Sequence, residues 1–227
     1  MYNRTAKTLT GGAIGQHNLG HVNSCSYNDN KDAFVCGNGS AAYDTAGQIF
    51  IIENAFDKTN FLYEEALVID FNGYGSKVNV VWGDSNNELY NVVFCITNDG
   101  YDIYRVELGE GETTLESGTI QKTTGFNGTY KVLQHWEYGT LKSDYANVVQ
   151  GAFFTGKYVG WGFGHRMGRV PVHKVMLLNN GKVETEEINF RTFDANGTEQ
   201  TFSLSGATWI DGYIFITYSN KIYMVKD

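Results

Sequence analysis

Short apolar segments separated by polar turns repeat along the chain. The first set has a strand of small and polar residues at 21–27, a polar turn at 28–31, an apolar strand at 32–37 and another at 48–54. Segments of this length, rich in β-branched and aromatic residues and bounded by Gly, Asn and Asp, predict β-strands. Three further sets follow in the same order, so the chain is expected to be a structural repeat.

The later copies are placed by the same order of strand, turn and strand. First strands are predicted at 77–83, 148–154 and 203–210, second strands at 89–97, 157–164 and 213–219, and third strands at 101–108, 173–180 and 221–227. A fourth strand follows in three copies, at 61–71, 113–120 and 182–190. The segment 122–147 is the least repeat-like part of the chain and is interpreted as an insertion.

The last copy has no fourth strand of its own. The N-terminal segment 5–10 could supply it, because its residues alternate as in a strand. Pairing of Thr8 and its neighbours with the last blade near Tyr223 would close a ring and remove two open sheet edges. The expected fold is therefore all-β, with a single domain spanning 1–227 that forms a small β-propeller of four blades. Five blades are the alternative if 122–147 contains a degenerate blade.

The composition agrees with this prediction and limits the classes of binding partner that are expected. The chain has 227 residues, 15% aromatic residues, 27 Gly and one Pro, which is long enough for one sizeable core. Its net charge of −8 disfavours a nucleic-acid partner, because phosphate backbones bind clustered Lys and Arg. No apolar run approaches the roughly twenty residues needed to span a bilayer, so membrane insertion is not expected. The first residues lack the apolar core of a signal peptide.

The three cysteines, Cys25, Cys36 and Cys95, all lie in predicted strands. An odd number of cysteines at such positions is expected to behave as reduced, buried, small hydrophobic residues. Their spacing matches no metal-binding motif. No disulfide, metal site or cofactor is therefore expected.

In a propeller, the first strand of each blade lines the central channel and alternates between the channel and the packed sheet. The predicted first strands share one polar position, held by Asn23, Asn79, Gln150 and Ser205, and the first of these strands begins at His21. A ring of amides and a hydroxyl could hydrogen-bond a polar ligand at one mouth of the channel. Ordered water or neighbouring backbone groups would satisfy the same side chains, and this structural role is the alternative.

The insertion carries a second group of candidate binding residues. His135, Trp136 and Tyr138 lie close together in it, and long loops on a rigid scaffold often hold binding residues. The alternative is a long surface hairpin whose aromatic residues pack on the blade beneath.

A third candidate is the loop 164–172, which contains the basic residues His165, Arg166 and Arg169. Arginine side chains match the geometry of phosphate and carboxylate groups, so this loop could receive an anionic ligand. The alternative is a solvated loop with ordinary surface charge.

Catalytic motifs are missing from the sequence. The predicted first strands contain no Asp or Glu, whereas glycoside hydrolysis generally requires two carboxylates in one pocket. Neither a GxSxG nor an HExxH motif occurs. Glu137 and Asp144 are the local acids that a hydrolase using the insertion would need. An enzyme is therefore not expected.

One stretch also resembles a known family. The sequence GHVNSCSYN, continuing through NKDAFVCGNG to GQIFIIEN over residues 20–54, resembles the GHxN-type blade repeat of propeller modules in tail-fibre and receptor-binding proteins of small tailed phages of Gram-positive bacteria. The second and third copies match in order and turn position, and the fourth matches in its strands.

The resemblance implies a non-enzymatic, virion-associated module that attaches a phage to its host by recognising a cell-surface glycan or a wall polymer such as teichoic acid. Its other partners would be virion tail proteins, and it would be assembled in the host cytoplasm with reduced cysteines. One alternative is a structural propeller that binds other components of a virion or another assembly and no glycan. A hydrolase on the propeller scaffold is the other alternative.

Overall fold

A computed structural model describes residues 2–3, 8–9, 19–39, 45–54, 62–83, 91–97, 102–114, 120–138, 148–164, 169–177, 180–193, 196–200, 206–218 and 221–226. Strands make up most of this described chain, with two short 3₁₀ turns, η2 (Tyr63–Glu65) and η3 (Asn72–Tyr74). Among the described residues, no helix has the length and apolar character needed to cross a bilayer. The prediction of an all-β fold is confirmed.

The described strands form four larger sheets, each a meander in which consecutive strands pair antiparallel. The first sheet contains β3 (Val22–Asn28), β4 (Ala33–Asn38), β5 (Gln48–Glu53) and β6 (Leu67–Asp70). The second contains β7 (Val78–Trp82), β8 (Val92–Thr97), β9 (Asp102–Thr114) and β10 (Ile120–Glu137). The third contains β11 (Val148–Phe154), β12 (Tyr158–Gly164), β13 (Arg169–Leu177), β14 (Val183–Phe193) and β15 (Glu199–Gln200). The fourth contains β16 (Gly206–Ile210), β17 (Tyr213–Tyr218) and β18 (Lys221–Lys226).

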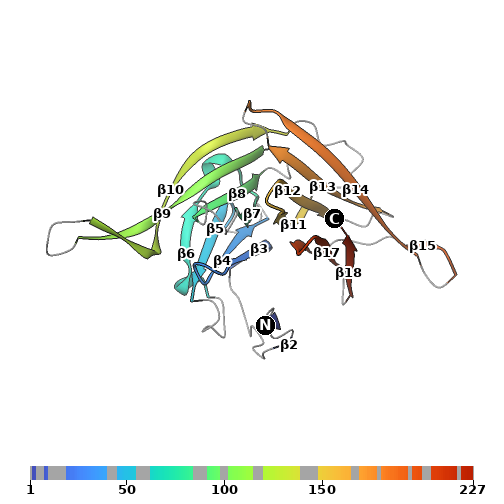
Figure 1. Cartoon of the computed structure of the whole chain (residues 1–227), viewed down its shortest axis with the longest axis horizontal. Coiled ribbons are helices and arrows are strands. Elements are labelled where there is room, and N and C mark those ends of the chain that lie inside the picture. The colour runs from blue at the N-terminus through green and yellow to red at the C-terminus, as the bar shows by residue number, and fades with distance from the viewer. Residues whose placement is uncertain are drawn as a thin grey trace.

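The first strands of the four sheets lie near the centre of the molecule (Figure 1). β3 contacts β7 and β11, and β11 also contacts β7 and β16. The long outer strands β10 and β14 run along the outside of the arrangement. The sequence prediction that the first strand of each repeat is the innermost strand agrees with this geometry.

The inner strand β7 is buried on both faces because sheets pack on either side of it. On β7, Val80 lies in the core between the first and second sheets, whereas Val81 lies in the core between the second and third. Successive side chains of a strand point to opposite faces, so adjacent apolar residues serve two interfaces. A smaller core around Phe153 and Ile216 joins the third and fourth sheets.

The outer strand of the second sheet differs from the prediction. The sequence places this strand at 113–120, but the observed strand is β10, which pairs with β9 along most of its length. The part of the predicted insertion at 122–137 therefore belongs to this strand and not to a separate blade. A register shift between Phe126 and Tyr130 interrupts the side-chain alternation. The sequence pattern therefore lacks the regular alternation that predicts a strand.

The predicted closure of the ring by the N-terminal segment is not observed. β2 (Thr8–Leu9) pairs with β1 (Tyr2–Asn3), so Thr8 is not paired with the strand that contains Tyr223. Among the described strands, β18 pairs with β17 alone, and Figure 1 shows β2 well apart from β18. Pairing of near neighbours closes a short loop and costs less chain entropy than joining the two ends.

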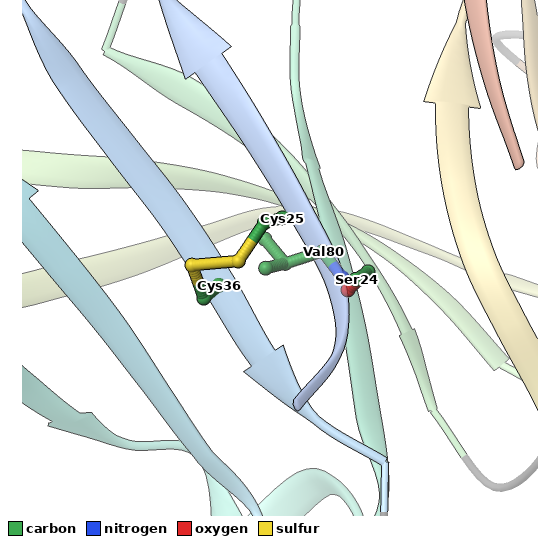
Figure 2. The surroundings of a disulfide bond; sticks show 4 residues. All are labelled: Ser24, Cys25, Cys36 and Val80. Carbon is green, nitrogen blue, oxygen red and sulfur yellow. Dashed lines mark hydrogen bonds between the residues drawn. A yellow bond between two sulfur atoms is a disulfide. The ribbon is translucent and has the colours of Figure 1, made fainter. Parts of the chain in front are cut away.

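The expectation of three reduced cysteines is wrong. Cys25 on β3 and Cys36 on β4 face each other in register, with their Cα atoms 4.2 Å apart, and form a disulfide (Figure 2). The two positions meet because a short turn joins their antiparallel strands, and a count of cysteines does not reveal this register. Cys95 is a free thiol and is fully buried, as the sequence predicts.

Candidate functional site

The polar position shared by the inner strands is buried. Asn23 is 7% exposed, and its Nδ2 donates a hydrogen bond to the backbone oxygen of Val149 at 3.0 Å. Asn79 is 2% exposed, and its Oδ1 accepts no hydrogen bond from the described part of the protein. Gln150 is half-buried, and Ser205 lies outside the described residues. The Asn23 amide therefore joins the first sheet to the third.

Two serines that the sequence prediction did not single out join the first two sheets. Ser24 Oγ accepts a hydrogen bond from the backbone nitrogen of Val80 at 2.7 Å, and Figure 2 shows the two residues side by side. Ser26 Oγ accepts a hydrogen bond from the backbone nitrogen of Trp82 at 3.3 Å. Both nitrogens lie on β7, which has no neighbour on this edge in its own sheet. The sequence could have indicated this pair, because residues two apart on a strand point to the same face.

Close backbone approaches leave little space between neighbouring sheets, at Gly37 on β4 and at Gly151 on β11. A Cβ atom added to Gly37 would lie 2.5 Å from the backbone oxygen of Val78, and one added to Gly151 would lie 2.2 Å from the backbone nitrogen of Ala207. Gly151 also has a φ of +77° at a bulge in β11. The hydrogen bond from Asn23 to Val149 gives Asn23 a structural role. Ligand binding by Asn23, Asn79 and Gln150 stays a prediction.

The three residues predicted together in the insertion are divided between two faces of the second sheet. Trp136 is 3% exposed and lies in the core between the second and third sheets. Tyr138 is half-buried, and its ring meets the ring of Trp161 edge to face at 5.3 Å. His135 is exposed and lies on the opposite face of β10. Of the three, His135 is the exposed one, and ligand binding by these residues stays a prediction.

His135 belongs to a cluster of aromatic rings between the first sheet and the outer strands of the second. Its imidazole stacks on Tyr104 at 4.5 Å with 8° between the planes, and its Nε2 lies 2.8 Å from Oδ1 of Asp102. Tyr74, on η3, meets the Tyr104 ring at 5.1 Å and is 37% exposed. We call this group the tyrosine cluster, and its members are Phe71, Tyr74, Tyr104, Tyr130 and His135.

Phe71 is the buried base of the tyrosine cluster. It stacks on Tyr74 at 4.6 Å and contacts Tyr104 and Tyr130 at 5.7 and 5.4 Å. The Tyr130 hydroxyl donates a hydrogen bond to the backbone oxygen of Asp70 at 3.2 Å. Rings held by several neighbours lose little further freedom when a ligand binds, which favours recognition.

The phenol groups of Tyr104 and Tyr130 are held in their neutral form. Burial raises the pKa of Tyr104, and the nearby Asp102 carboxylate adds to the shift. Burial also raises the pKa of Tyr130, with smaller contributions from Tyr74 and Asp70. At neutral pH these side chains are therefore hydrogen-bonding hydroxyls on apolar rings.

An open hollow of about 290 Å³ adjoins the cluster at Tyr130. Its wall is formed by the bulge in β10, where Asn127 Oδ1 accepts hydrogen bonds from the backbone nitrogen and the Oγ1 of Thr129 at 3.0 and 2.7 Å. The other lining residues are Asn91, Glu107, Leu108, Gly109, Glu110 and Lys131. Amide, hydroxyl and carboxylate groups thus lie next to aromatic rings.

A buried ion pair fixes this bulge to the first sheet. Lys31 Nζ is paired with Glu110 Oε1, and their side chains are 6% and 9% exposed. The backbone nitrogen of Phe126 donates a hydrogen bond to Oε1 of Glu53 at 3.0 Å. The Phe126 ring also stacks on Trp82 at 5.7 Å. The outer arm of the second sheet is therefore anchored where it forms the hollow.

The remaining predicted site residues are not brought to this cluster. His21 is exposed, and its backbone oxygen accepts a hydrogen bond from the backbone nitrogen of Gly39 at 3.0 Å. His165 and Arg166 lie outside the described residues, and Arg169 is the first residue of β13. Within the described ranges, no group of three or more His, Cys, Asp or Glu side chains is arranged to hold a metal ion.

Comparison with known proteins finds similarity in structure only. No family profile and no curated protein sequence matches the chain. Among solved structures, the β-propeller domain of Cps50 (Swd1) from Myceliophteria thermophila is similar with a TM-score of 0.44 and 10% identity, over 91% of this chain and 54% of that one. U3-55K gives a TM-score of 0.42 and 10% identity, over 91% of this chain and 62% of that one. The WD40 β-propeller domain of Doa1 gives 0.35 and 11%, over 89% of this chain and 77% of that one.

This chain spans 54% of the Cps50 domain, 62% of U3-55K and 42% of AztD from Citrobacter koseri, which is another structure with similarity to it. The low identities and TM-scores assign neither a family nor a function to it.

Proposed function

We propose that the chain is a non-enzymatic binding module, built as a four-bladed β-propeller, that recognises a cell-surface glycan through the tyrosine cluster. The observation that carries this proposal is that two exposed rings, Tyr74 and His135, both contact the buried ring of Tyr104. Sugars offer an apolar face of C–H groups and a rim of hydroxyls, and aromatic rings beside polar groups complement both.

Charge narrows the class of glycan. Asp102 lies against His135. In the adjoining hollow the charges are balanced, because Lys131 lies in register with Glu107 and Lys31 is paired with Glu110. The chain as a whole carries a net charge of −8. Like charges repel a phosphate-rich polymer such as teichoic acid, so a neutral glycan is favoured over an anionic one.

Attachment of a virion to its host is the setting we propose for this binding. It rests on the resemblance of residues 20–54 to the blade repeat of phage receptor-binding proteins. The disulfide between Cys25 and Cys36 suits a protein that works outside the cell, because reducing conditions in the cytosol disfavour such bonds. Several copies on one particle would multiply a weak single-site affinity.

The test is binding to an array of neutral and phosphate-bearing bacterial cell-wall glycans, followed by calorimetric titration of the best ligand. We expect Tyr74→Ala to weaken binding by about tenfold or more, because an exposed aromatic contact is lost. Tyr63→Ala is the matched control, since Tyr63 is also 37% exposed but lies on η2 and contacts Phe50. Equal affinity of the two variants, or no glycan binding at all, would reject the proposal.

A protein-interaction module is the second candidate function. It is favoured by large apolar side chains that are exposed on the fourth sheet, at Ile210, Ile222 and Met224. Stable association with another tail or capsid protein, together with no signal on the glycan array, would support it over the first.

A further inference from the structure

The two cysteines of the disulfide differ in their access to solvent. Cys25 lies on β3, the first strand of its sheet, and is exposed, whereas Cys36 on β4 is 0% exposed. Cys36 lies in register with Phe50 on β5 and is buried in an apolar cluster that also contains Leu19 and Ile52. A thiolate in solution therefore reaches this bond from the side of Cys25.

Access decides which sulfur exchanges. Exchange begins when a thiolate attacks a disulfide sulfur, and its rate depends on which sulfur is attacked and on how accessible that sulfur is. Attack on Cys25 Sγ forms a mixed disulfide there and sends the electron pair of the broken bond to Cys36 Sγ. Apolar surroundings disfavour a thiolate, so Cys36 takes up a proton and becomes a buried thiol. A second external thiolate then attacks the external sulfur of the mixed disulfide, which releases Cys25 as a thiol and joins the two external groups in a disulfide of their own.

We propose that Cys25 and Cys36 form a redox-active pair, in which Cys25 exchanges with small thiols such as glutathione and Cys36 is the resolving cysteine. In the direction of oxidation, the Cys25 thiolate attacks glutathione disulfide and one glutathione thiolate leaves. Cys36 then loses its proton, attacks Cys25 Sγ, expels the second glutathione and closes the bond. Exposed disulfides are more readily reduced than shielded ones, so this bond opens in a reducing compartment and closes outside it.

The disulfide fixes the strand that joins the first two sheets. Ser24 and Ser26 lie on the opposite face of β3 from Cys25, and they accept hydrogen bonds from the backbone nitrogens of Val80 and Trp82 at 2.7 and 3.3 Å. β3 is thus tied covalently to β4 on one face and hydrogen-bonded to β7 on the other (Figure 2). Reduction removes the covalent tie and should loosen the contacts to β7.

Two single variants test which sulfur exchanges. The folded variants Cys36→Ala and Cys25→Ala are incubated with glutathione disulfide, and mass spectrometry maps the adduct. Cys25 of the first variant should form a stable adduct, whereas Cys36 of the second should react about 100-fold more slowly, because it is buried. Cys95, a fully buried thiol in the same molecule, should stay unmodified and so reports that each variant is folded. Equal rates at Cys25 and Cys36, or a faster reaction at Cys36, would overturn the assignment.

Hydrogen exchange of the wild-type protein tests the coupling without any substitution. Reduced glutathione should open the bond in the absence of denaturant, and the amides of Val80 and Trp82 should then exchange about tenfold faster than in glutathione disulfide. The amides of Ile214 and Ile216 on β17 of the fourth sheet are the control and should change less. A bond that glutathione opens only in denaturant would overturn the proposal. Equal acceleration on β7 and β17 would also overturn it, since the bond would then only stabilise the whole fold.

Discussion

The side-chain amide of Asn23 on β3 donates a hydrogen bond to the backbone carbonyl of Val149 on β11, across 3.0 Å. This contact joins two sheets that are not neighbours in the sequence, near the centre of the molecule, and both residues are buried. Together with the hydrogen bond from Val80 to Ser24, it links β3 to each of the next two sheets. The polar inner residues thus act as connections between sheets.

Removal of the Asn23 amide should destabilise the fold. We expect Asn23→Ala to lower the free energy of unfolding by about 1–3 kcal/mol, because a buried hydrogen bond is lost and the Val149 carbonyl loses this donor. Chemical denaturation measures the change. Asn72→Ala is the control, since Asn72 is exposed on η3 and its loss should cost less than about 0.5 kcal/mol. Equal effects of the two substitutions would contradict the structural role of Asn23.

Two glycines with similar backbone angles offer a test of the close approach at the centre. Gly151 has a φ of +77° and Gly156 has a φ of +82°, but a Cβ at Gly156 would have no atom within 4 Å, whereas one at Gly151 would meet Ala207. Gly156→Ala should cost about 1 kcal/mol from backbone strain alone. Gly151→Ala should cost about 2–5 kcal/mol, because overlap adds to the same strain. Thermal or chemical unfolding distinguishes them, and similar losses would place β16 farther from β11.

The disulfide can be tested by alkylation and mass spectrometry. In denaturant without reductant, one thiol should be alkylated, that of Cys95, whereas reductant should expose Cys25 and Cys36 as well. The Cys25→Ser/Cys36→Ser variant should be less stable by about 3 kcal/mol, because the unfolded chain is no longer cross-linked. Reductant should not change the stability of that variant. Three reactive thiols in the untreated protein would contradict the bond.

Alkaline pH should destabilise the tyrosine cluster. The pKa values of Tyr104 and Tyr130 are raised by burial, so both contribute stability below about pH 10, the ordinary phenol pKa, and this contribution is lost as the pH rises further. Urea denaturation should show a fall in stability above pH 10 that is smaller in the variant Tyr104→Phe/Tyr130→Phe. Tyr213→Phe, at a phenol that is 36% exposed on the fourth sheet, is the control. An identical fall in all three proteins would contradict the prediction.

Trp136 and His135 should behave differently although they are adjacent. Trp136→Ala should reduce stability by about 3–5 kcal/mol, because it empties a buried site between the second and third sheets. His135→Ala should reduce glycan binding with a loss of stability of about 1 kcal/mol or less, since His135 is exposed. Calorimetry of the free and titrated proteins measures both effects. Loss of binding without loss of stability in Trp136→Ala would move the site to the other face of β10.

Some features of the core could be predicted from the sequence, whereas the tyrosine cluster could not. The apolar runs around Val80 and Val35 predict strands, and both residues lie in the core between the first and second sheets. The polar position at Asn23 and Asn79 was found from the repeat, since both residues fall at the same place in successive copies. The tyrosine cluster was not found, because its members come from η3, β9 and β10 and meet only when two sheets pack.

What the sequence by itself determined is local: the strands, their turns and their order, because side-chain alternation and turn residues act over a few positions. The tertiary structure decided which residues meet across strands and sheets. Strand register places Cys25 opposite Cys36. A bulge near Asn127 allows an irregular segment to form the outer strand β10. β2 pairs with β1 instead of with the last sheet. These outcomes depend on register and on competition between distant partners, and neither is encoded in the pattern of a single segment.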